Sequence, residues 1–106
     1  MSLQQLRDSL KKGFYVKNLY GMIPICRGLA VNSRKPSPFF LIEQIFLNIA
    51  RQWEERDLPV EEAGKVQSKM IQPLNELLDV IDKNVSDQEI LDHMNKVTSI
   101  YLNTFK

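Results

Sequence analysis

The sequence contains a single cysteine and a single histidine, and each scarcity excludes a class of site. One cysteine, Cys26, cannot form an internal disulfide, which is typical of a protein from a reducing compartment. One histidine, His93, cannot supply the two Glu-x-x-His motifs of a di-iron carboxylate bundle. Glu89 and His93 share a helix face at i, i+4, but one histidine beside carboxylates is a weak metal signal. We therefore predict no metal and no other cofactor.

Long hydrophobic runs are missing as well. The longest charge-free run in the N-terminal third covers residues 18–26, nine residues, whereas a membrane span needs about 20. The first ten residues contain Arg7 and Asp8 and lack the apolar segment of a signal peptide. These absences predict a cytoplasmic protein without a membrane span. A chain of 106 residues is expected to form one domain, 1–106, with a core of its own.

The motifs of common enzymes are also lacking. The sequence has no P-loop, no dinucleotide fingerprint and no pattern of a known nucleic-acid-binding module. Cys26 stands between Ile25 and Arg27 without a catalytic motif around it, which favours a small buried hydrophobic residue. A nucleophilic pair of Cys26 with His93 stays as an alternative. The sequence thus predicts a protein that is not an enzyme.

Three segments carry clear helix patterns. A capping box at Ser86–Glu89 predicts a helix over 87–104, with Val85 and Ile90 at the staple positions. Ser37 as N-cap and Pro38 as the first helical residue predict a helix over 38–56. Its inner face would consist of Phe39, Ile42, Phe46, Ile49, Ala50 and Trp53.

The third pattern covers 60–83 and contains Pro73. A proline inside a helix removes one backbone hydrogen bond and crowds a carbonyl, at a cost of about 3 kcal/mol. The apolar phase nevertheless continues from Met70 to Leu74, and Gln72 is a poor cap for a new helix. We therefore predict one kinked helix over 60–83, which Leu58-Pro59 separates from the preceding helix.

The N-terminal third has weaker signals. Ser2 is a candidate cap for a helix with Leu3, Leu6 and Leu10 inward, continuing with a kink through 14–20. Two glycines and two prolines in 21–36 predict an irregular, partly helical connection with Ile23, Ile25 and Leu29 inward. The expected fold is an all-α, four-helix bundle-like single domain with a kinked third long helix.

Charge is divided unevenly along the chain. Residues 1–36 have a net charge of +6 and residues 37–106 a net charge of −5. Either the basic third packs on the acidic remainder, of its own chain or of a partner subunit, or it forms a basic face for an anionic partner. Arg34 and Lys35 precede a helix N-terminus, which already favours anions. A candidate anion-binding site therefore consists of Arg27, Arg34, Lys35 and Ser37.

These observations favour a helical bundle that acts through protein–protein contacts and forms a homo-oligomer. The reason is the broad apolar surface of the 38–56 helix, which exceeds a normal stripe. One alternative is a regulatory or nucleic-acid-associated protein that uses the basic third. Another is a carrier of a small ligand or cofactor, with a pocket beside Pro73. The sequence does not identify a partner, a ligand or a pathway.

Overall fold

The structure is a computed structural model that describes residues 2–55 and 60–105 of the chain. These residues form five helices, α1 (Leu3–Lys12), α2 (Val16–Val31), α3 (Ser37–Glu54), α4 (Val60–Asp82) and α5 (Asp87–Thr104). Helix accounts for 85% of the described residues, and no strand occurs among them. The predicted all-α fold is confirmed, with five helices where we expected four. The predicted separator Leu58-Pro59 lies outside the described residues.

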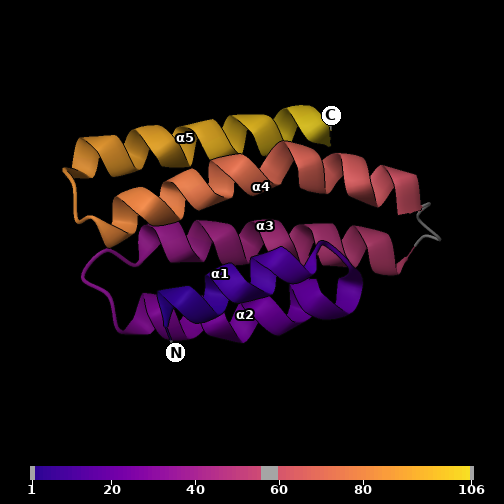
Figure 1. Cartoon of the computed structure of the whole chain (residues 1–106), viewed down its shortest axis with the longest axis horizontal. Helices are drawn as coiled ribbons and strands as arrows, with labels where there is room; N and C mark the ends of the chain where they lie inside the picture. Colours follow the sequence, from indigo (N-terminus) through magenta and orange to yellow (C-terminus); the bar gives the residue numbers. More distant parts are fainter. Residues whose placement is uncertain (1, 56–59, 106) are drawn as a thin grey trace.

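The helices lie side by side along the long axis of a molecule of 40 × 26 × 19 Å (Figure 1). α2 and α3 form one antiparallel pair, and α4 and α5 form another. α1 packs against α2 and α4, whereas α3 also contacts α5. α3 is therefore flanked by α2 and α5, and this position decides which of its residues reach the surface.

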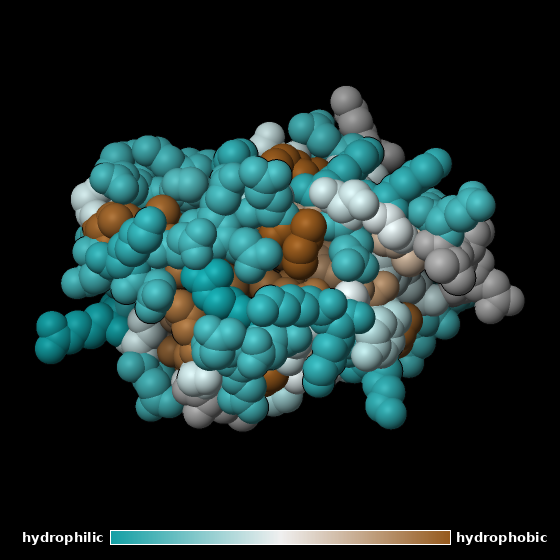
Figure 2. All heavy atoms as spheres, in the orientation of Figure 1, coloured by the Kyte–Doolittle hydropathy of each residue, from teal (hydrophilic) through white to brown (hydrophobic). Residues whose placement is uncertain are grey.

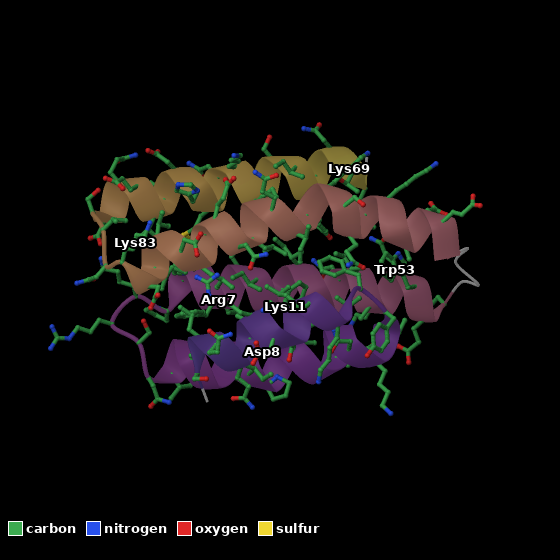
Figure 3. The ribbon with its side chains drawn as sticks, viewed as in Figure 1. Arg7, Asp8, Lys11, Trp53, Lys69 and Lys83 are labelled. Atoms are coloured by element: carbon green, nitrogen blue, oxygen red, sulfur yellow. The ribbon has the colours of Figure 1, made fainter. Side chains whose placement is uncertain are left out.

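One hydrophobic cluster fills the interior between the two helix pairs. All six residues that we expected on the inner face of α3 are buried. The rings of Phe14 and Phe46 form a T-shaped pair with a centroid distance of 5.8 Å. Trp53 lies towards the C-terminal end of α3 (Figure 3). The 3.6-residue periodicity of the sequence thus identified this face correctly.

α4 runs without interruption through Pro73, as predicted. Leu74, Leu77 and Leu78 are fully buried just after the proline, so burial of these side chains offsets the hydrogen bond that the proline removes. The ribbon of α4 changes direction near its middle (Figure 1). The helix ends at Asp82, and Asn84 follows with a positive φ of 53°.

Two predicted caps are present. The hydroxyl of Ser86 accepts a hydrogen bond from the Glu89 N–H at 3.3 Å, which is one half of the expected capping box. The hydroxyl of Ser2 accepts from the Gln5 N–H at 3.1 Å, and Gln5 reciprocates on the Ser2 N–H. Ser37, in contrast, is the first helical residue of α3 and not its side-chain cap. Pro36 has helical dihedral angles, and its carbonyl accepts from the Phe40 N–H, so the helix starts one residue earlier than predicted.

The predicted irregular connection at 21–36 is wrong over most of its length. α2 is continuous from Val16 to Val31 and passes through Gly21, Pro24 and Gly28. Pro24 is exposed, while Leu19, Met22, Ile25 and Cys26 form the buried face of the helix. Packing of this face in the core outweighs the low helix propensity of the glycines and the proline. Only residues 32–36 form a connection.

A sharp break between α1 and α2 replaces the kinked continuation that we expected. Gly13 has a backbone φ of +107°, a conformation that residues other than glycine rarely adopt. The Phe14 N–H donates to Gln67 Oε1 of α4 at 3.0 Å. The side-chain amide of Asn18 donates to the carbonyls of Ser9 and Gly13 at 2.8 and 2.7 Å. These bonds satisfy backbone groups that the end of α1 leaves unpaired.

The basic N-terminal third does pack on acidic residues of the same chain. Arg7 of α1 pairs with Asp79 of α4 at 2.6 Å, and Arg7 is labelled on α1 in Figure 3. Arg27 and Lys35 pair with Glu43 and Asp87, respectively. Three of the seven cations in residues 1–36 thus meet carboxylates of residues 37–106, which supports the interpretation of internal complementarity.

The face shown in Figure 2 is mostly hydrophilic, with hydrophobic atoms in several small areas. Over the part of the chain that the structure describes, no helix has the length and the apolar character needed to cross a membrane. Among the larger apolar side chains that stay exposed, Val31, Phe40 and Leu91 lie around the N-terminal end of α3.

Candidate functional site

A pocket between α2 and α3 combines apolar walls with an ion pair. Its volume is about 240 Å³, and we call it the α2–α3 pocket. Its apolar lining consists of Cys26, Ala30, Val31, Phe39 and Phe40, and its polar lining of Arg27, Glu43 and Gln44. Val31 is 78% exposed and Phe40 is 59% exposed. Both are large apolar side chains in contact with water at the mouth of a pocket.

The ion pair in this pocket joins a buried group to an exposed one. The Glu43 side chain is only 5% exposed, and its Oε1 accepts a hydrogen bond from Nε of Arg27 at 2.8 Å. The Arg27 side chain is 68% exposed. A buried carboxylate needs such a partner, because without one it is strongly destabilising. Glu43 therefore fixes Arg27 at the pocket.

Cys26 lies beside this ion pair and is fully buried. Burial, with a smaller contribution from the Glu43 carboxylate, raises the pKa of the Cys26 thiol to about 12. A thiol with this pKa is almost entirely protonated at neutral pH and is a poor nucleophile. Its placement agrees with the small hydrophobic residue predicted from the sequence.

A second pocket, of about 250 Å³, lies between the start of α3 and α5, and we call it the α3–α5 pocket. Its charged and polar lining consists of Arg34, Lys35, Ser37 and Asp87, and its apolar lining of Pro36, Pro38, Ile90, Leu91 and Met94. Nζ of Lys35 lies 2.7 Å from Oδ1 of Asp87 and 3.4 Å from the Val85 carbonyl oxygen. Leu91 is 47% exposed.

The structure brings three of the four predicted anion-binding residues together. Arg34, Lys35 and Ser37 line the α3–α5 pocket, whereas Arg27 lines the separate α2–α3 pocket. Arg27 and Lys35 already have carboxylate partners. Binding of an external anion stays a prediction, and Asp87, which is exposed, is the group that such an anion would displace.

We predict that sulfate or phosphate raises the melting temperature of the wild type more than that of the variant Arg34→Ala. The reason is that Arg34 lines the α3–α5 pocket and adds to the positive potential at the N-terminus of α3. Arg27 is left unchanged, because it is the partner of the buried Glu43 carboxylate. Thermal unfolding in sodium sulfate, with sodium chloride of equal ionic strength as the control, measures the difference. Equal stabilisation of both proteins would leave residues 32–36 as a connector only.

His93, the remaining candidate from the sequence, lines neither of these pockets. His93 is half-buried, and its Nδ1 is buried without a hydrogen-bond partner among the described residues. Within the same residues, no three histidine, cysteine or acidic side chains are grouped as a metal site would need. A hollow of about 370 Å³ is lined by Glu61, Glu62, Lys65, Val66 and Lys69 of α4 and by Thr104, none of which the sequence predicts as a site residue.

Sequence reasoning missed Glu43. Its spacing to Phe39 and Phe46, at i−4 and i+3, places it on the buried face of α3. A carboxylate on the inner face of a helix is a signal, because such a group needs a cationic partner. The identity of that partner, Arg27, depends on how α2 and α3 pack and was not available from the spacing.

In comparisons with known proteins, the chain matches no family model, and no curated protein or solved structure is significantly similar to it.

Proposed function

We propose that this protein is a non-enzymatic helical bundle that works through protein–protein contacts and associates with itself through the N-terminal half of α3. The observation that carries the proposal is the exposure of Val31, Phe40 and Leu91 around that part of α3, beside two pockets. Burying a side chain of this kind contributes about 1.5–3 kcal/mol. A partner that covered all three would gain a substantial part of a stable association.

The sizes of the two pockets favour protein side chains over a ligand or cofactor. Sites for small molecules usually have volumes of about 300–1,000 Å³, and both pockets are smaller. The predicted pocket beside Pro73 is not supported by any of the hollows described above, and Pro73 itself is buried in α4. A carrier of a small ligand is therefore the weaker alternative.

We predict that the protein forms a dimer or a higher oligomer at micromolar concentration. Light scattering coupled to size exclusion measures the mass, which is 12.3 kDa for the monomer. A single 12 kDa species at high protein concentration would contradict the proposal. Retention on heparin that weakens steeply with salt would instead favour the nucleic-acid-associated alternative, because counterion release governs such binding.

A further inference from the structure

We propose that the α2–α3 pocket of one copy receives Leu91 of a second copy, and that Asp92 of that copy binds Arg27. A two-fold axis near the start of α3 repeats both contacts. This inference rests on the proposed self-association and names the surfaces that meet.

The α2–α3 pocket needs an occupant that is apolar and acidic. Its exposed rim contains Val31 and Phe40, and covering them requires an apolar side chain. Arg27 uses Nε for Glu43 and is mostly exposed, so its two Nη groups are available to a second carboxylate. A volume of 240 Å³ equals roughly eight water molecules at about 30 Å³ each, which is room for one or two side chains.

The charge on α2 favours an acidic partner. α2 contains two cations, Lys17 and Arg27, and no acidic residue, and Arg27 lines the pocket. The carboxylate that lines the pocket, Glu43, is buried and bonded to Arg27. An acidic segment brought to this surface would thus meet no acidic residue of α2, which favours orientation of the partner by charge.

The start of α5 has the required chemistry. Leu91 is exposed there and lies between Asp87, one turn earlier, and Asp92, the next residue. Asp87 is already paired with Lys35. Asp92 is exposed and accepts a hydrogen bond from Gln88 on Oδ1, which leaves Oδ2 as an acceptor for Arg27. The combination of one exposed leucine and one adjacent carboxylate fits the pocket described above.

The two surfaces lie where a symmetric dimer needs them. The α2–α3 pocket and the α3–α5 pocket both border residues 36–40 at the start of α3. In a two-fold dimer, residue i of one copy contacts residue j of the other, and j contacts i in return. With an axis near these residues, each copy inserts its Leu91 into the α2–α3 pocket of the other copy. One dimer would contain two apolar contacts and two ion pairs.

Mixing two variants that each dimerise poorly tests this arrangement. Phe40→Lys damages the pocket and leaves Leu91 intact, whereas Leu91→Lys has the reverse effect. Each variant alone loses both apolar contacts, so we expect its dimer dissociation constant to rise roughly 100-fold. A mixed pair keeps one of the two contacts, and its dissociation constant should rise only about tenfold. Sedimentation velocity of the separate and mixed variants measures these values.

Leu102→Lys is the matched control, because Leu102 is an exposed leucine of the same helix, about three turns from Leu91. It should dimerise as the wild type does. Asp92→Lys should weaken the dimer and reduce its dependence on salt, since an exposed ion pair is screened by ions. Circular dichroism verifies folding, and Phe40→Gln or Leu91→Gln replaces a lysine variant that unfolds.

Three outcomes would overturn the inference. If both lysine variants dimerise as the wild type does, another surface mediates self-association, while the proposed function survives. If Phe40→Lys dissociates and Leu91→Lys does not, or the mixture gains nothing, the pocket has another occupant. If the wild type stays monomeric at about 100 µM, proposed self-association itself fails, and binding of an acidic peptide or a nucleic acid becomes the question.

Discussion

Replacing Leu77 with alanine should lower the free energy of unfolding by about 2–5 kcal/mol. Leu77 is fully buried in the cluster that joins the two helix pairs, so its truncation removes apolar contacts and leaves a cavity. Trp53→Ala should have an effect of similar size, since Trp53 is buried in the same cluster. The effect of Leu77 is the more informative one, because the residue lies one turn beyond Pro73.

Urea denaturation followed by tryptophan fluorescence measures the change, because Trp53 is the only tryptophan and is buried. The variant Trp53→Ala contains no tryptophan, so its unfolding by urea is followed by circular dichroism instead. Leu102→Ala is the control, and because Leu102 is exposed it should change stability by less than about 0.5 kcal/mol. An unchanged urea denaturation curve for Leu77→Ala would show that the apolar phase does not continue across Pro73.

The Cys26 thiol should be almost inert in the folded protein and reactive in the unfolded one. Its pKa is about 12, compared with an ordinary value of 9.0, so the folded protein contains about 1,000-fold less thiolate at neutral pH. Burial of the sulfur blocks the approach of a reagent in addition. The rate of labelling by an aromatic disulfide reagent, with and without urea, measures the difference. Rapid labelling of the native protein would contradict the burial of Cys26.

The same pKa shift predicts a loss of stability at high pH. The unfolded thiol loses its proton near pH 9 and the folded one near pH 12, so the unfolded state binds fewer protons between these values. Stability from Cys26 is therefore complete below pH 9 and decreases as the pH rises towards 12, by up to about 1.4 kcal/mol per pH unit. Cys26→Ala, compared across this range, separates this effect from the titration of tyrosines and lysines.

The sequence by itself determined the elements whose signals are local. Ser2 and Ser86 mark the starts of α1 and α5. Each hydroxyl accepts a hydrogen bond from the backbone N–H three residues later, so this signal depends only on neighbouring residues. The buried faces of α3 and α4 followed from apolar periodicity, which even Pro73 did not interrupt. The division of the chain into a basic N-terminal third and an acidic remainder was equally visible in the sequence.

Tertiary structure alone decided the elements where local preference and packing disagree. Gly21, Pro24 and Gly28 predict an irregular segment, and yet α2 is helical there because Met22, Ile25 and Cys26 are buried in the core. Nothing in residues 10–16 predicts that the Phe14 N–H donates a hydrogen bond to Gln67, which lies 53 residues further along the chain. Such a bond exists only once α1 and α4 lie side by side.

The candidate site shows the same division. The sequence identified Arg34 and Lys35 as unusual cations, because their position just before a helix is a local fact, and it grouped Arg27 with them. The fold decided that Arg27 binds Glu43 beside the α2–α3 pocket and that Lys35 binds Asp87 beside the α3–α5 pocket. Each pair joins residues from different helices or connections. Electrostatic attraction is strong only over a few ångströms, so the packing of the apolar faces determines which charged groups form a pair.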